Sequence, residues 1–260
     1  MGTRSHRRIH FLDELRGFCV ILMVFFHSFY TAGYLFGAAW GVSLFQFFLP
    51  VEPIFAGLFI FISGICCNLS HNNVKRGICL AGVAAGMSLA LWFAVRAEWL
   101  TPDSLIWFGI LQFLAVCILL YALLYPTIRF IPAWLGLVLC AVLFLSTYHV
   151  FPADGGFIGI DGVFVWDLPS FSPINPLAYV LGLCPVETAG DYFPLLPWMF
   201  CFFGGVFVGR WHKHFPRWMS HRHVPLFASI GKVALWVYLA HQPVIFGICS
   251  AVSWLIGTLS

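Results

Sequence analysis

Seven long apolar segments constrain the fold of this chain more than any other feature of its sequence. About 20 predominantly apolar residues are enough for a helix to cross the hydrocarbon core of a bilayer. Only 9% of the residues are Asp, Glu, Lys or Arg, and 61% are hydrophobic, whereas soluble domains carry about 25% charged residues. These proportions exclude a cytosolic enzyme, a nucleic-acid binder and a disordered chain. The apolar segments are about 14–35, 48–69, 78–95, 104–125, 133–148, 195–210 and 227–257.

The sequence therefore predicts an all-α fold: a polytopic membrane bundle of seven or eight transmembrane helices in a single domain over residues 1–260. Two shorter stretches are ambiguous. Residues 36–49 are expected to form an interfacial helix, and residues 175–185 are too short to span the bilayer. Residues 149–194, rich in Gly, Pro and Asp, are interpreted as a lid or funnel on the outer side. The chain contains no internal repeat, which disfavours a secondary transporter.

The placement of the few charges predicts that the N-terminus is cytoplasmic. With seven spans in this orientation, 12 of the 13 Lys and Arg residues lie on the inner side, and only Arg96 lies outside. Eight of the 10 Asp and Glu residues lie on the outer side. This distribution follows the positive-inside rule, and the reverse orientation would violate it.

The first span carries Asp13, Arg16 and His27 among apolar residues. Arg16 and His27 are 11 residues apart, so they lie within about 20° of each other on one helix face and roughly 16 Å apart along the axis. This pattern predicts a polar stripe with His27 as a general base near its outer end, since imidazole transfers protons near neutral pH. The alternatives are an interior His27 satisfied by hydrogen bonds and an Arg16 that snorkels or pairs with Asp13.

The last span contains a second candidate, His241, followed by Gln242 and Pro243. Tyr238 lies one turn earlier on the same face. If this helix runs outward, His241 reaches a depth comparable with that of His27, and we predict a catalytic role for it. Tyr238 and Gln242 are predicted to bind substrate. The alternative is that His241 makes a structural hydrogen bond between helices.

Three further polar residues are candidates with an equally simple structural alternative. Gln112 in the fourth span is predicted to bind substrate, or else to hydrogen-bond between helices. Glu52 is a second candidate for substrate binding, or else an acid that favours a helix N-terminus. Asp191, where the chain re-enters the membrane, is a candidate catalytic residue, or else a surface acid at a helix start.

The inner segment 210–223, RWHKHFPRWMSHRH, is basic and aromatic. Arg210 and Lys213 in this segment, with Arg16, are predicted to bind an anionic cytosolic ligand. Alternatively, the segment anchors the protein to lipid headgroups. Its histidines lack a neighbouring acid or Cys, and the nine Cys form no CxxC pair, so no metal site is expected.

Five stretches, taken together and in order, resemble the heparan-alpha-glucosaminide N-acetyltransferase catalytic-domain family. The first also resembles the wider acyltransferase-3 membrane enzymes, through an Arg-Gly pair with a His eleven residues after the Arg. The stretches extend from Asp13 to about Ile245, nearly the whole chain. They are DELRGFCVILMVFFH, FIFISGIC, IWFGILQFLAVCILL, DYFPLLPWMFCFFGGVFVG and GKVALWVYLAHQPVI.

The resemblance implies acetyl transfer across a membrane. Such enzymes take an acetyl group from cytosolic acetyl-CoA and deliver it to an acceptor, often an amino sugar, on the far side. His27 would then be the general base, His241 would assist it or bind the acyl group, and an acetyl-imidazole intermediate would be a variant of this route. The implied partners are acetyl-CoA, an extracytoplasmic glycan or amino sugar and membrane lipid, with a homodimer as a further expectation and no nucleic acid.

The chain departs from the lysosomal members, which have Asn at the position of His27, while other members tend to have His at the position of Gln112. The resemblance is therefore closer to a small bacterial-type enzyme of the plasma membrane that modifies an envelope glycan. Two other classes remain: a permease or exporter for a small amphipathic solute, and a non-catalytic partner in a biosynthetic complex.

Overall fold

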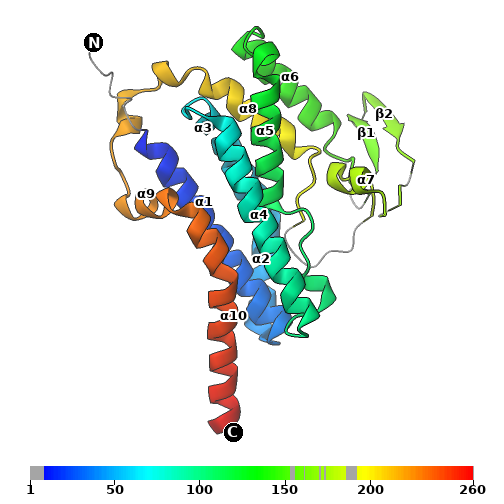
Figure 1. Ribbon diagram of the computed structural model, residues 1–260, viewed down its shortest axis with the longest axis vertical. Helices are drawn as coiled ribbons and strands as arrows, with labels where there is room; N and C mark the ends of the chain where they lie inside the picture. Colours follow the sequence, from blue (N-terminus) through cyan, green and yellow to red (C-terminus); the bar gives the residue numbers. More distant parts are fainter. Residues whose placement is uncertain are drawn as a thin grey trace. The chain divides into compact units, whose positions relative to one another are not determined.

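The computed structural model describes residues 9–152, 156–160, 162–169, 171–172, 174–185 and 192–259, without the side chains of residues 103, 213 and 256–259. This part of the chain is mostly helical, as the sequence predicts, with one two-stranded sheet (Figure 1). The α-helices are α1 (His10–Tyr30), α2 (Ala39–Phe48), α3 (Glu52–Cys67), α4 (Asn73–Arg96), α5 (Ile110–Ile128), α6 (Ala133–Ser146), α7 (Pro176–Leu181), α8 (Trp198–Gly209), α9 (Pro225–Lys232) and α10 (Ala234–Leu259).

All seven predicted apolar segments contain helices, but the last, 227–257, is not a single helix, because α9 ends at Lys232 and α10 begins at Ala234. Two of these helices, α6 and α8, are apolar but shorter than a full span. The predicted number of seven or eight spans and the inner N-terminus remain predictions. Within the described residues, five helical segments are long and apolar enough to cross a membrane: His10–Leu35, Ala39–Cys67, Asn73–Arg96, Ile110–Ile128 and Ala234–Leu255.

Helix α4 shows most clearly that the protein is an integral membrane protein. Its apolar residues are largely uncovered, with Ile78, Leu89 and Phe93 all more than half exposed. Water would penalise such a surface by about 25 cal/mol for each Å² of exposed apolar area. Lipid carries no such penalty, so the exposed face of α4 is suited to the bilayer interior.

The stretch 36–49 differs from the separate interfacial helix expected from its sequence. Here α2 continues through a 3-10 turn, Leu49–Val51, into α3, so Ala39–Cys67 is one continuous candidate span. Pro50 lies in the 3-10 turn that separates α2 from α3, and Pro53 lies in the first turn of α3, where a missing backbone N–H is tolerated.

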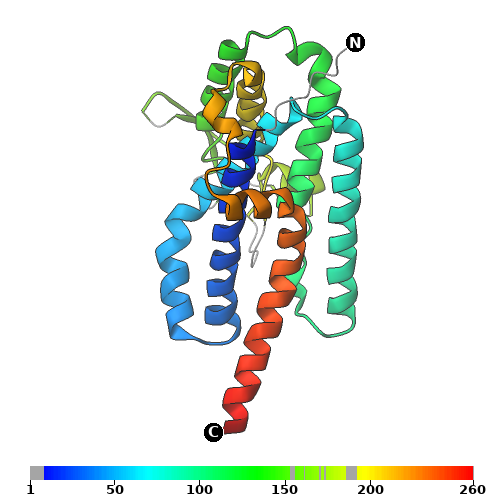
Figure 2. The same cartoon turned by 90° about the vertical axis from the view of Figure 1, so that its left-hand side faces the viewer.

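The contacts divide the chain into two compact units, residues 1–62 with 214–260 and residues 63–213. In the first unit, α1 packs against α9, α10 and α2, and a π-helical turn, Thr31–Leu35, extends α1 before the chain reverses into α2 (Figure 2). Glycines let the backbones of α1 and α9 touch. A Cβ at Gly17 would lie 2.0 Å from the carbonyl oxygen of Phe227, and one at Gly231 would lie 1.8 Å from that of Asp13.

In the second unit, α4 pairs with α5, and α8 packs on α6 and on the last turns of α3. Gly64 permits this last contact, because a Cβ there would lie 2.0 Å from the carbonyl oxygen of Phe202. The Asn68 amide donates to the carbonyl of Val206 at 2.8 Å. Small residues and side-chain amides are common at helix contacts in membranes, where burial of apolar surface does not drive association.

The segment predicted to be an outer lid contains β1 (Phe157–Ile160), β2 (Phe164–Asp167) and α7. The two strands form an antiparallel hairpin. As predicted, the helix in 175–185 is too short to span the bilayer: Asn175 caps its start, and Gly182, with a φ of 85°, ends it. Burial raises the pKa of the Tyr192 and Tyr179 phenols, and Tyr192 donates to the carbonyl of Tyr179.

Candidate active site

The first unit brings His27 of α1 and His241 of α10 together. Their imidazole centroids are 5.0 Å apart, with an angle of 49° between the ring planes. His241 is buried and His27 is half-buried. Both residues are predicted to be catalytic. They are far apart in the sequence, but the packing of α10 on α1 makes them neighbours.

A backbone contact fixes which nitrogen of neutral His241 carries the proton. Its Nδ1 is hydrogen-bonded to the carbonyl oxygen of Tyr238, one turn earlier in α10. A carbonyl oxygen can only accept, so Nδ1 is the donor and the lone pair of the neutral ring is on Nε2. His241 is therefore held as the tautomer whose Nε2 can accept a proton.

Two more predicted residues border this pair. The Tyr238 ring lies 5.4 Å from the His241 ring. Gln242 donates from Nε2 to Thr31 Oγ1 at 3.3 Å, while its Oε1 is buried without a hydrogen-bond partner among the described residues. Thr31 is fully buried. We call His27, Thr31, Tyr238, His241 and Gln242 the histidine cluster.

Thr31 is a member of the histidine cluster that the sequence analysis missed. It follows His27 by four residues, so the two share a face of the continuous helix. The spacing of four residues could have identified Thr31 as a neighbour of His27. A single Thr in an apolar segment, however, can also donate a hydrogen bond from its hydroxyl to its own helix backbone.

Arg16 and Asp13 form an ion pair within α1, with 3.6 Å between Nη1 and Oδ1. This is one of the two alternatives considered for Arg16. The side chain of Arg16 is 20% exposed. The pair keeps a guanidinium at the start of α1, on the same helix face as His27.

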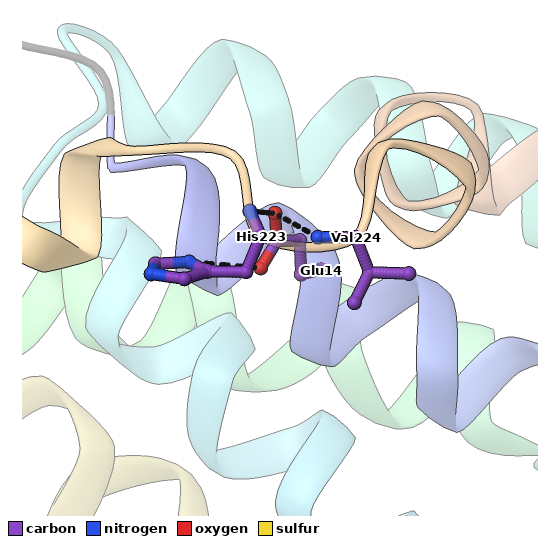
Figure 3. Close-up of polar contacts among 3 residues, drawn as sticks. All are labelled: Glu14, His223 and Val224. Atoms are coloured by element: carbon purple, nitrogen blue, oxygen red, sulfur yellow. Dashed lines mark hydrogen bonds and ion pairs between the residues drawn. The ribbon is translucent and has the colours of Figure 1, made fainter.

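Glu14 is a second residue that sequence reasoning missed, and it positions α9 (Figure 3). Its Oε1 accepts hydrogen bonds from the backbone N–H groups of His223, at 2.6 Å, and Val224, at 3.1 Å. Its Oε2 lies 3.6 Å from Nδ1 of His223. Glu14 is only 5% exposed. A buried carboxylate at a helix N-terminus satisfies donors that lack partners within the helix.

Arg210 caps the C-terminal end of α5. It donates from Nη1 to the carbonyls of Ile128 and Ile131, and from Nη2 to that of Arg129. A cation is favourable at this end, where the last carbonyls lack partners within the helix. Lys213 belongs to a 3-10 turn, His212–His214, and its side chain lies outside the described residues.

The remaining predicted residues are Gln112, Glu52 and Asp191. Gln112 accepts from Gly109 N at 3.1 Å and donates to Ser88 Oγ of α4 at 2.9 Å, the interhelical contact considered as the alternative to substrate binding. Glu52 lies in the first turn of α3, where its alternative interpretation placed it. Asp191 lies outside the described residues. No group of His, Cys, Asp and Glu within the described ranges could hold a metal ion.

A protein-family model described as "Heparan-alpha-glucosaminide N-acetyltransferase, catalytic" matches residues 8–243. The chain belongs to this family. The match confirms the resemblance drawn from the five stretches, and both residues of the His27–His241 pair lie inside it. No match was found among curated proteins or among solved structures. Membership of the heparan-alpha-glucosaminide N-acetyltransferase catalytic family and the apolar helices together support an integral membrane acetyltransferase.

Proposed function

We propose that the protein transfers an acetyl group from cytosolic acetyl-CoA to an amino sugar or glycan on the outer side of the membrane. The observation that carries this proposal is the contact between His27 and His241 on two membrane helices. Polar side chains cost free energy when they lie between apolar membrane helices, so two neighbouring imidazoles there indicate a functional role. Acid–base chemistry on an acceptor provides one.

The chemistry can be written with these side chains. The acceptor nitrogen or oxygen attacks the thioester carbonyl of acetyl-CoA, and His27 takes the proton that the acceptor loses. The tetrahedral intermediate then collapses, the carbon–sulfur bond breaks, and the CoA thiolate takes the proton from the imidazolium. The products are the acetylated acceptor and CoA thiol. A positioned base of this kind contributes about 10²–10⁴ in rate.

His241 assists this reaction as a second imidazole. The carbonyl of Tyr238 keeps the proton on Nδ1, so Nε2 can accept a hydrogen bond or a proton during transfer. In a variant of the route, Nε2 attacks the thioester carbonyl, the carbon–sulfur bond breaks, and CoA leaves as the thiolate. The acceptor then attacks the acetyl-imidazolium, the carbon–nitrogen bond breaks, and the proton that the acceptor loses passes through His27 to the thiolate. Tyr238 and Gln242 line the same cluster and are proposed to contact the substrate, as are Glu52 and Gln112 from their own positions.

We propose that cationic side chains hold the phosphates of CoA, with Arg16 and Lys213 as the first candidates. Arg210 already uses three N–H groups on backbone carbonyls, and a guanidinium has five, so two remain for a phosphate oxygen. Asp191 is proposed to act at the acceptor. We expect the enzyme to work in a bacterial plasma membrane on an envelope glycan.

The test is acetyl transfer by purified protein in liposomes supplied with radiolabelled acetyl-CoA. His27→Ala should lower the transfer rate by about 10²-fold or more while the protein still inserts, because the general base is lost. His71→Ala is the matched control, since His71 is exposed outside the membrane helices, and it should keep the wild-type rate.

Wild-type activity in purified His27→Ala would overturn the assigned mechanism. Solute flux without dependence on acetyl-CoA would favour a permease, and absence of label from every acceptor would favour a non-catalytic partner. Mass spectrometry of surface glycans from cells with and without the protein would then identify the acceptor and the atom that is acetylated.

A further inference from the structure

The hairpin β1–β2 has an apolar face that is half-buried on β1 and exposed on β2. Side chains of a strand alternate between its two faces, and residues directly opposite share a face. Ile158 pairs with Trp166 and Ile160 with Phe164, so these four side chains form one face. Trp166 is 75% exposed and Phe164 is 51% exposed. An isolated two-stranded hairpin is marginally stable in water, so we expect further contacts on this face to stabilise it.

The base of the hairpin is fixed to the end of α6. Phe157 N donates to the carbonyl of His149 at 3.0 Å, three residues after α6 ends. The Phe157 and His149 rings stack, with centroids 5.0 Å apart. Both views show the hairpin beside this end of α6 (Figures 1 and 2). The apolar face therefore lies close to wherever α6 leaves the membrane.

Helix α6 is too short to cross the bilayer by itself. Its 14 residues extend roughly 21 Å at 1.5 Å per residue, whereas the hydrocarbon core is about 30 Å thick. One face of α6 is exposed along its whole length, at a spacing of three or four residues, and Tyr148 continues this row toward the hairpin. The exposed residues are Trp134, Leu135, Val138, Leu139, Val142, Leu145 and Tyr148.

We propose that the β1–β2 hairpin inserts its Ile158, Ile160, Phe164 and Trp166 face into the lipid headgroup interface, extending the lipid-facing surface of α6. Aromatic side chains, Trp above all, concentrate at this depth. The open edges of a two-stranded sheet keep the hairpin out of the hydrocarbon, where unsatisfied backbone groups are not tolerated. The opposite face carries the exposed Asp167 together with Val165 and Phe157, whose ring stacks on His149, so the face with Trp166 is the more apolar of the two.

Lipid fits this face better than a glycan does. The four side chains offer only the indole N–H of Trp166 as a hydrogen-bonding group, whereas sugars require several polar partners. The inference stands apart from the proposed acetyl transfer, because it depends only on the membrane helices and the hairpin.

The test uses full-length protein in nanodiscs of lipids brominated near the headgroup. The emission of Trp166 is obtained by subtracting the spectrum of Trp166→Phe from that of the wild type. We expect brominated lipid to quench this difference emission strongly and aqueous acrylamide to quench it little. Trp134→Phe, at the other end of α6, provides the matched control and should report an indole quenched by the same lipid.

Several outcomes would overturn the proposal. Quenching of Trp166 by acrylamide alone would place the face in water. Resistance to both quenchers would indicate a protein partner or a second copy, and protection by an acceptor sugar would indicate a glycan site. A Trp134 signal that lipid does not quench would remove the premise that α6 faces lipid.

Discussion

At the scale of single residues, the Gln242–Thr31 hydrogen bond ties α10 to the turn that follows α1. Gln242 donates to a hydroxyl that is fully buried, and its carbonyl oxygen has no protein partner within the described residues. An amide with one satisfied end is suited to hold the helices in register and still to accept a hydrogen bond from a substrate. The same contact keeps His241 beside His27.

We predict that Thr31→Val lowers the free energy of unfolding in detergent by about 0.6–2 kcal/mol, the usual range for a hydrogen bond between membrane helices. Valine keeps the shape of threonine but removes the acceptor. Thermal unfolding measures the change. Ser28→Ala is the control, because Ser28 donates to the carbonyl of Val24 in its own helix, at 2.7 Å. An equal loss in both variants would mean that the interhelical bond contributes nothing specific.

At the scale of elements, α9 is the short helix on which the geometry of the first unit depends. Its start is held by Glu14, and its residues Phe227 and Gly231 are in close backbone contact with α1. Neither contact resembles ordinary apolar packing, since one is a carboxylate on two N–H groups and the other depends on the absence of a Cβ. Both therefore respond sharply to conservative substitutions.

Replacing Glu14 should loosen the start of α9. Glu14→Ala leaves two backbone donors without their acceptor, and we expect a loss of about 1–3 kcal/mol in the free energy of unfolding. Glu14→Gln keeps a carbonyl acceptor and should lose clearly less. Limited proteolysis between residues 210 and 225 would measure the opening of this segment. Equal cleavage of the two variants would contradict the role of Glu14 as a hydrogen-bond acceptor.

Gly231→Ala should separate α9 from α1. The added Cβ would lie 1.8 Å from the backbone oxygen of Asp13, and backbone must then move, at a typical cost of about 1–3 kcal/mol. Gly247→Ala on α10 is the matched control, because its Cβ would meet no described atom within 4 Å, and it should be neutral or slightly stabilising. Denaturant or thermal unfolding in detergent compares the two, and a stable Gly231→Ala would refute the close crossing.

At the scale of the whole molecule, the orientation in the membrane remains the main prediction from charge. Helix α4 runs from Asn73 to Arg96, so the segments that flank it lie at its opposite ends. The positive-inside rule puts the end with Lys75 and Arg76 in the cytoplasm.

A cysteine at each end of α4 tests this orientation. With an impermeant maleimide, Trp99→Cys should be labelled in intact cells, since Trp99 is 80% exposed and predicted to be outside. His71→Cys should be labelled only after the membrane is opened. The wild-type chain gives the background from its nine native cysteines. The reverse labelling pattern would contradict the predicted topology. The surface proposed to bind acetyl-CoA would then face away from the cytosol.

Most of the helices, and the faces on which their polar residues lie, can be predicted from local sequence alone. Hydropathy located all seven apolar segments, and the helical period placed Arg16 and His27 on one side of α1, because both properties are local. Local sequence could not show that 36–49 joins the next helix, since proline, present here at positions 50 and 53, is favoured both in turns and in first helical turns.

Which of those faces meet depends on tertiary packing. The bonds from Gln242 to Thr31 and from His223 to Glu14 join residues 211 and 209 positions apart, and the His27–His241 contact depends on the same packing. A helical period gives the direction of a side chain but not its partner. The partner is set where glycines such as Gly17 and Gly231 let two backbones touch.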